Sequence, residues 1–168
     1  MTARRLLLGV VVVVTALLLQ TAVLARLPLP GGVPDLLLVL VVGFALTEGP
    51  LSGTLTGFFA GLLADLGADH ELGRTALVYA LVGYLAGLAS DDRPPSVLLP
   101  FGVVALSAAG AVTTYALEGL MLADPRIDWS SYWQALAGTT AYSVLLTPFV
   151  VPVVGALVRR LEPDPFRR

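Results

Sequence analysis

The chain has 168 residues, of which 57% are hydrophobic and only 13% are charged, and its mean hydropathy is +0.86. This composition leaves too little polar surface to cover a soluble globule, so it excludes that class and predicts an integral membrane protein. The chain contains no cysteine, which excludes disulfide bonds and thiol chemistry.

Six apolar segments follow one another along the chain, separated by breaks rich in proline, glycine and charge. The firmest breaks lie at residues 26–34, 91–95 and 124–128, where no helix is expected to continue. We therefore predict an all-α integral membrane protein, a six-helix polytopic bundle that forms a single membrane domain over residues 1–168. The predicted spans are residues 6–25, 36–47, 51–66, 75–90, 97–123 and 133–158.

The junction between the second and third segments, Glu48-Gly49-Pro50, allows more than one interpretation. Each flanking segment would be roughly 20 Å long, short of the hydrocarbon core of about 30 Å. The two segments are either short helices with buried ends or parts of one long broken span. A re-entrant pair would give the same parity as two separate crossings.

The number of crossings decides which loops are cytoplasmic, so the positions of the arginines distinguish these topologies. With six crossings and a cytoplasmic N-terminus, three arginines lie outside and seven lie inside. The seven are Arg4, Arg5, Arg93, Arg159, Arg160, Arg167 and Arg168. Treating residues 36–66 as one crossing would place four inside and six outside, against the positive-inside tendency. We therefore expect six crossings, or a re-entrant pair of the same parity, with both termini in the cytoplasm.

The same topology predicts an acidic rim at the outer surface. Its members are Asp35, Asp65, Asp69, Glu71, Glu118, Asp124 and Asp128. Glu48 and Glu118 are the ionisable groups closest to the apolar segments, and neither has an obvious basic partner in the sequence. Each could serve function or simply reach a headgroup region.

A ladder of small residues organises the third segment. Gly49, Gly53, Gly57, Gly61 and Asp65 fall at intervals of four. Association of helices in lipid relies on close backbone approach at small residues, so the ladder predicts a helix-packing face. Packing within the chain, docking of a partner's helix and a homodimer contact are all compatible with it.

Other residues indicate anchoring rather than catalysis. Trp129, Tyr132 and Trp133 cluster at the start of the last segment, where aromatic rings commonly sit at headgroup depth, and we expect a membrane anchor with no nucleic-acid role. His70 is the only histidine and has no neighbouring ligand pattern for zinc. We find no nucleophile motif, phosphate loop or dinucleotide fingerprint, and predict no catalytic, cofactor-binding or metal-ligating residues.

Motifs in the first half of the chain are similar to those of a known family. They are Pro34-Asp35-Leu36-Leu37-Leu38, Glu48-Gly49, Gly53, Gly57-Phe58, Gly61-Leu62-Leu63-Ala64-Asp65, Leu72-Gly73 and Tyr79-Ala80-Leu81-Val82-Gly83-Tyr84-Leu85. In order and spacing they resemble the rod shape-determining protein MreD family. The length and the six apolar segments extend the similarity over the chain, whereas Pro148 and Pro152 have no counterpart in the pattern.

The resemblance implies a non-enzymatic scaffold in the bacterial inner membrane that supports peptidoglycan synthesis and cell shape. It implies work beside an MreC-like protein, the actin-like MreB, a SEDS glycosyltransferase and a class B penicillin-binding protein. It also implies a fold similar to the substrate-binding subunits of energy-coupling-factor transporters. On this basis we expect the face of Gly53, Gly57 and Gly61 to receive the membrane helix of the MreC-like partner, oriented by Asp65 and the acidic rim.

The alternative is transport, by a vitamin-binding subunit or a small secondary carrier. Vitamin-binding subunits resemble one another in an Ala-x-x-x-Ala patch on the first helix, which Ala16, Ala22 and Ala25 do not form. The clear instance of that spacing is Ala105 to Ala109, in the fifth segment. The absence of this patch from the first segment therefore favours the scaffold over a vitamin-binding subunit.

Overall fold

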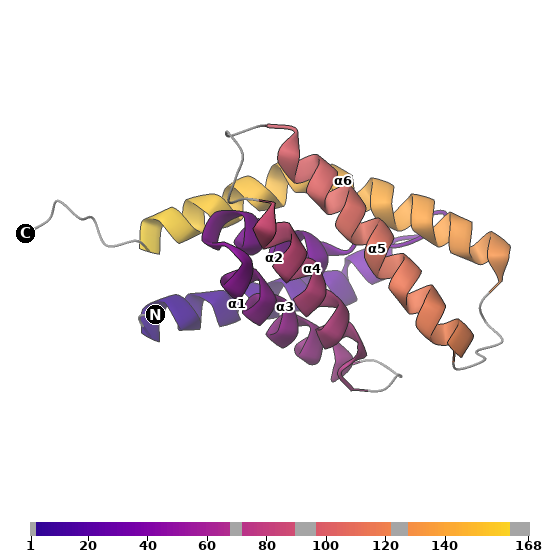
Figure 1. Cartoon of the computed structure of the whole chain (residues 1–168), viewed down its shortest axis with the longest axis horizontal. Helices are drawn as coiled ribbons and strands as arrows, with labels where there is room; N and C mark the ends of the chain where they lie inside the picture. The colour runs from indigo at the N-terminus through magenta and orange to yellow at the C-terminus, as the bar shows by residue number, and fades with distance from the viewer. Residues whose placement is uncertain (1–2, 68–71, 90–96, 122–127, 162–168) are drawn as a thin grey trace, which may run out of the picture.

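The computed structural model describes residues 3–67, 72–89, 97–121 and 128–161, and side chains from Leu7 onward. Six α-helices and one short 3-10 helix make up this described part of the chain, which confirms the predicted all-α architecture (Figure 1). The elements are α1 (Ala3–Ala22), η1 (Leu24–Arg26), α2 (Leu36–Glu48), α3 (Pro50–Asp65), α4 (Arg74–Leu88), α5 (Leu99–Met121) and α6 (Trp129–Leu161).

Helix α2 forms the centre of the bundle. It contacts each of the other five α-helices, and every residue from 37 to 45 is buried. A helix that is covered on all sides must be apolar on all sides, which explains why α2 reads as a continuous run of apolar residues without a polar stripe. Its 13 residues make a rod of roughly 20 Å, so the longer helices extend past it.

The break between α2 and α3 is sharp and has a local cause. Gly49 has a φ of +86°, a conformation that residues with side chains rarely adopt, and it ends α2 and begins α3. Pro50 follows at the first helical position, where its missing N–H is not needed. Helices α2 and α3 are therefore two separate helices joined at Gly49.

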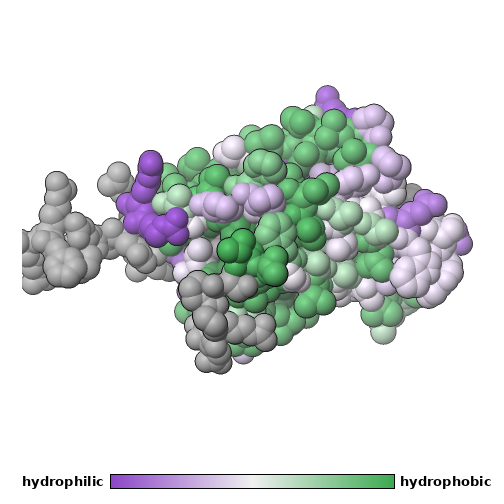
Figure 2. Space-filling model, turned by 90° about the horizontal axis from the view of Figure 1, so that it is seen from above, coloured by the Kyte–Doolittle hydropathy of each residue, from purple (hydrophilic) through white to green (hydrophobic). Residues whose placement is uncertain are grey.

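Three helical segments are long and apolar enough to cross a bilayer: Leu7–Arg26, Leu99–Met121 and Trp129–Arg160. Large apolar side chains on them lie on the outside of the bundle, such as Leu106, which is 78% exposed. Figure 2 shows apolar residues over the middle of one face and hydrophilic residues toward its ends. This surface is that of a membrane protein, whose exposed apolar groups contact lipid.

The first and last helices of the bundle have one end in common. The start of α1 and the end of α6 lie at the same end of the long axis (Figure 1). Helix α6 begins at Trp129, four residues before the predicted span, and continues through Pro148 and Pro152 to Leu161. Asp69, His70, Glu71, Asp124 and the ends of the predicted fourth and fifth spans lie outside the described residues.

Candidate functional site

The glycine ladder of α3 lies against α4 in the same chain. A Cβ atom added to Gly57 would stand 2.1 Å from the carbonyl oxygen of Tyr79, and one added to Gly61 would stand 2.5 Å from Cα of Ala76. A Cβ on Gly53 would lie 2.4 Å from the carbonyl oxygen of Gly83. The two backbones are therefore in direct contact along the ladder, with no room for even a methyl group.

Helix α4 carries a matching pair of glycines, Gly83 and Gly87, for which the sequence had predicted no packing role. A Cβ on Gly83 would lie 2.1 Å from the carbonyl oxygen of Gly53, and one on Gly87 would lie 2.3 Å from Cα of Pro50. Their spacing of four residues repeats the pattern of α3, and this spacing is the feature of the sequence that could have predicted their packing role. Small residues on both helices permit the close approach.

These contacts correct the expectation that this glycine face receives a partner's helix. Gly53, Gly57 and Gly61 face α4, so packing within the chain, the alternative that the ladder also allowed, is the arrangement observed. Gly49 occupies the turn before α3: nothing lies within 4 Å of its own Cβ position, but its backbone carbonyl carbon would stand 2.8 Å from a Cβ on Gly87 of α4. Gly53, Gly57 and Gly61 leave no room for a helix other than α4.

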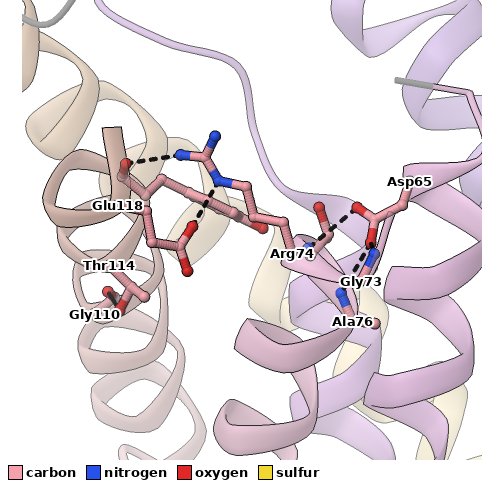
Figure 3. Close-up of polar contacts among 9 residues, drawn as sticks. Asp65, Gly73, Arg74, Ala76, Gly110, Thr114 and Glu118 are labelled. Carbon is pink, nitrogen blue, oxygen red and sulfur yellow. Dashed lines mark hydrogen bonds and ion pairs between the residues drawn. The ribbon is translucent and has the colours of Figure 1, made fainter. Parts of the chain in front are cut away.

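Asp65 ends the ladder and caps α4 from the neighbouring helix. Its carboxylate accepts hydrogen bonds from the backbone N–H groups of Gly73 at 2.8 Å, Thr75 at 3.1 Å and Ala76 at 3.3 Å (Figure 3). The N-cap residue of α4, Gly73, has no side chain to serve these donors. Asp65 is only 2% exposed, so its described role is to join α3 to α4 rather than to face a partner.

Glu118, which the sequence left without a partner, pairs with Arg74. Nε of Arg74 lies 2.6 Å from Oε2 of Glu118 and joins the start of α4 to α5 (Figure 3). The same guanidinium donates to the backbone carbonyl of Tyr115 at 2.8 Å and lies 5.4 Å from the centre of its ring. Glu48 instead accepts a hydrogen bond from the Ser52 hydroxyl at 2.5 Å, across the junction of α2 and α3.

We expect the Arg74 and Glu118 pair to be energetically coupled. The two side chains are 21% and 26% exposed, so solvent screens the charges only in part. A double-mutant cycle with Arg74→Met and Glu118→Gln should give a coupling of about 1 to 2 kcal/mol in unfolding free energy, measured by denaturant titration in detergent. Glu118→Gln combined with Arg160→Met, at the far end of α6, should be additive, and equal values for the two cycles would contradict the pairing.

A second polar cluster surrounds Asp35, the residue before α2. Its carboxylate accepts the Tyr79 hydroxyl at 2.6 and 2.7 Å, the backbone N–H of Leu38 at 3.0 Å and the Gln20 side-chain amide at 3.5 Å. Its own backbone N–H donates to the Ser143 hydroxyl at 3.0 Å. Four helices, α1, α2, α4 and α6, thus meet at one short segment.

The Asp35 cluster brings together residues far apart in the sequence. Asp35 and Tyr79 both belong to motifs that carry the family resemblance, but only the tertiary structure joins them; Gln20 and Ser143 had no sequence signal. Burial raises the pKa of the Asp35 carboxyl, and the hydrogen bonds from Tyr79, Leu38 and Gln20 oppose this shift. Asp35 lies before α2 and outside the apolar helices.

The aromatic residues at the start of α6 form one exposed cluster. The rings of Trp129, Tyr132 and Trp133 have centroids 5.2 to 5.6 Å apart, and the two tryptophans are 71% and 51% exposed. The Tyr132 hydroxyl lies 3.1 Å from that of Thr113 on α5. Asp128 precedes the cluster, and a hydrogen bond from Ser130 lowers the pKa of its carboxyl. Anchoring at headgroup depth stays a prediction for these rings.

Comparisons with known proteins bear on the first half of the chain. Residues 2–92 match a protein-family model described as rod shape-determining protein MreD. No curated protein and no solved structure matches the chain. The matched residues contain α1 to α4, and hence the glycine contact, the Asp65 cap and most of the Asp35 cluster. Among the described residues, no group of three or more histidine, cysteine and acidic side chains is placed to hold a metal ion.

Proposed function

This chain belongs to the rod shape-determining protein MreD family, and from that membership we propose that it is a non-enzymatic membrane scaffold of the bacterial cell-elongation complex. The family has its role in rod shape determination, so the chain acts in cell shape. As a scaffold it docks an MreC-like partner and supports peptidoglycan synthesis beside MreB, a SEDS glycosyltransferase and a class B penicillin-binding protein. The observation that carries the proposal is the family match over residues 2–92.

The arrangement of the bundle supports a multi-pass protein of the bacterial inner membrane with both termini in the cytoplasm. The start of α1 and the end of α6 lie at one end of the molecule (Figure 1). Arg159 and Arg160 lie in the last turn of α6, at that same end. Positive charges favour the cytoplasmic side, which orients this end inward.

A groove between α4 and α5 is the surface that we assign to the partner's membrane helix. It has a volume of about 310 Å³ and is lined by apolar and small residues, among them Leu81, Leu85, Leu106, Ser107 and Gly110. Apart from the backbone of α5 around it, no atom of the described residues lies within 4 Å of the Cβ position of Gly110, in contrast to Gly53, Gly57 and Gly61 of α3. The absence of a side chain there serves no packing within the described chain and leaves room for a close helix contact.

Substitution of Gly110 should separate partner binding from folding. We expect Gly110→Leu to accumulate and unfold like the wild type, because its side chain enters open space, but to reduce recovery of the MreC-like protein at least about tenfold. The measurement is affinity purification from native membranes in mild detergent, with mass spectrometry of the recovered proteins. Gly9→Leu on α1, which also enters open space, is the matched control and should leave recovery unchanged.

If Gly110→Leu recovers as much of the MreC-like protein as the wild type does, the groove between α4 and α5 is not the docking surface. The same purification distinguishes the scaffold from the alternative, a vitamin-binding subunit of a transporter or a small secondary carrier. The observation that favours transport is a cavity beside Asp35. Recovery of paired ATPases and a coupling subunit, without wall-synthesis enzymes, would replace the scaffold with transport.

A further inference from the structure

A cavity of about 210 Å³ lies beside Asp35, where the end of α1 and the start of α2 meet α5 and α6. Its polar lining is Gln20, Asp35, Tyr115 and Thr139, and its apolar walls include Ala111 and Val112. The scaffold function makes no use of this cavity. It lies at the end of the bundle opposite the start of α1, because Gln20 stands near the end of that helix.

The cavity carries a carboxylate that no described cation neutralises. Within the part of the chain that the structure describes, the partners of the Asp35 carboxylate are neutral: the Tyr79 hydroxyl, the Gln20 amide and the N–H of Leu38. The positive end of the α2 dipole offsets roughly half a charge. Burial without a cation raises the pKa of this carboxyl, and a cation bound in these surroundings of low polarity would be attracted strongly and would favour the ionised form.

The size and lining of the cavity define the kind of cation. A water molecule takes about 30 Å³, so the volume corresponds to roughly seven waters and greatly exceeds that of one bare ion. It is smaller than the roughly 300 Å³ at which pockets for drug-sized ligands begin. Alanine and valine walls beside the carboxylate suit a short carbon body that ends in a charged donor.

We propose that this cavity binds a primary ammonium group on a small organic body, with Asp35 as its counter-ion. The ammonium donates hydrogen bonds to the Asp35 carboxylate. The Gln20 side chain, which lines the cavity, is held in place because its carbonyl oxygen accepts a hydrogen bond from the N–H of Leu37 at 2.9 Å. Two sources carry this chemistry: a phosphatidylethanolamine headgroup that enters from the bilayer, and a free amine of similar size.

The full-length protein in nanodiscs of phosphatidylcholine and phosphatidylglycerol tests the proposal with two probes. Free ethanolamine is titrated by calorimetry, and short-chain phosphatidylethanolamine is added and counted by native mass spectrometry. We expect saturable binding of at least one probe. Binding of free ethanolamine assigns a soluble amine, and retention of the lipid alone assigns a headgroup.

Asp35→Asn removes the charge and keeps the shape, because asparagine is an equally good N-cap and its carbonyl still accepts from Leu38 and Tyr79. We expect it to weaken the binding at least about tenfold. Asp128→Asn, the same change at an exposed position, should leave binding unchanged. Val112→Phe fills the cavity and keeps the carboxylate, so it should abolish binding. This second variant tests the proposal if Asp35→Asn does not fold. Binding of neither probe, or equal binding by wild type and Val112→Phe, would overturn the proposal.

Discussion

Gly57→Leu should prevent the bundle from assembling. The Cβ position of Gly57 lies 2.1 Å from the carbonyl oxygen and 2.5 Å from the carbonyl carbon of Tyr79, so the obstacle is backbone, which cannot rotate away as a side chain does. The helices α3 and α4 would have to separate along their whole contact. We expect a loss of at least about 3 kcal/mol in unfolding free energy, and little folded protein in the membrane.

The measurement is the yield of monodisperse protein in detergent and its thermal unfolding. Gly102→Leu on α5 is the matched control, since the same side chain there meets nothing within 4 Å, and it should behave as wild type. Wild-type yield and unfolding temperature for Gly57→Leu would show that α3 and α4 do not pack as described.

Partner binding should be tested on a surface outside the contact between α3 and α4. Loss of an MreC-like protein from a Gly57→Leu purification would report the loss of the fold, because the substituted face lies inside the bundle. Gly110→Leu places the same bulk on an open surface. Only the second substitution can therefore report on a docking surface.

Asp65→Ala should have the second largest effect on stability. The substitution leaves the N–H groups of Gly73, Thr75 and Ala76 without their acceptor at a position that is only 2% exposed. Unsatisfied buried donors cost about 1 to 3 kcal/mol each when water cannot reach them, and relaxation of the helix end recovers part of this. We expect a loss of about 2 to 4 kcal/mol in unfolding free energy.

Two variants test how much of this loss is due to the burial of the cap. Asp65→Asn retains one carbonyl acceptor, so its loss should fall between those of wild type and Asp65→Ala. Asp128→Ala removes a carboxylate that caps α6 at an exposed position, and it should cost clearly less stability than Asp65→Ala because water replaces the lost hydrogen bonds. Hydrogen exchange of the first turn of α4 provides the local measurement, and unchanged protection of Thr75 and Ala76 in Asp65→Ala would contradict the cap.

The sequence by itself determined the membrane class, the number of helices and their approximate ends. These features depend on local properties: runs of apolar residues, proline and glycine at the breaks, and the missing side chain at Gly49 that permits a positive φ. The family was also accessible, because its motifs occur in order along the first half of the chain. The ladder could be predicted to be a packing face because its small residues recur every four positions.

Only the tertiary structure decided which surface meets which. The ladder has the same sequence whether its partner is α4 or another protein, so its spacing could not choose between them. Arg74 and Glu118 are 44 residues apart, as are Asp35 and Tyr79, and nothing local relates the members of either pair. Their contacts depend on how the other five α-helices pack around α2. Because α2 is apolar on all its faces, its burial requires helices from both halves of the chain.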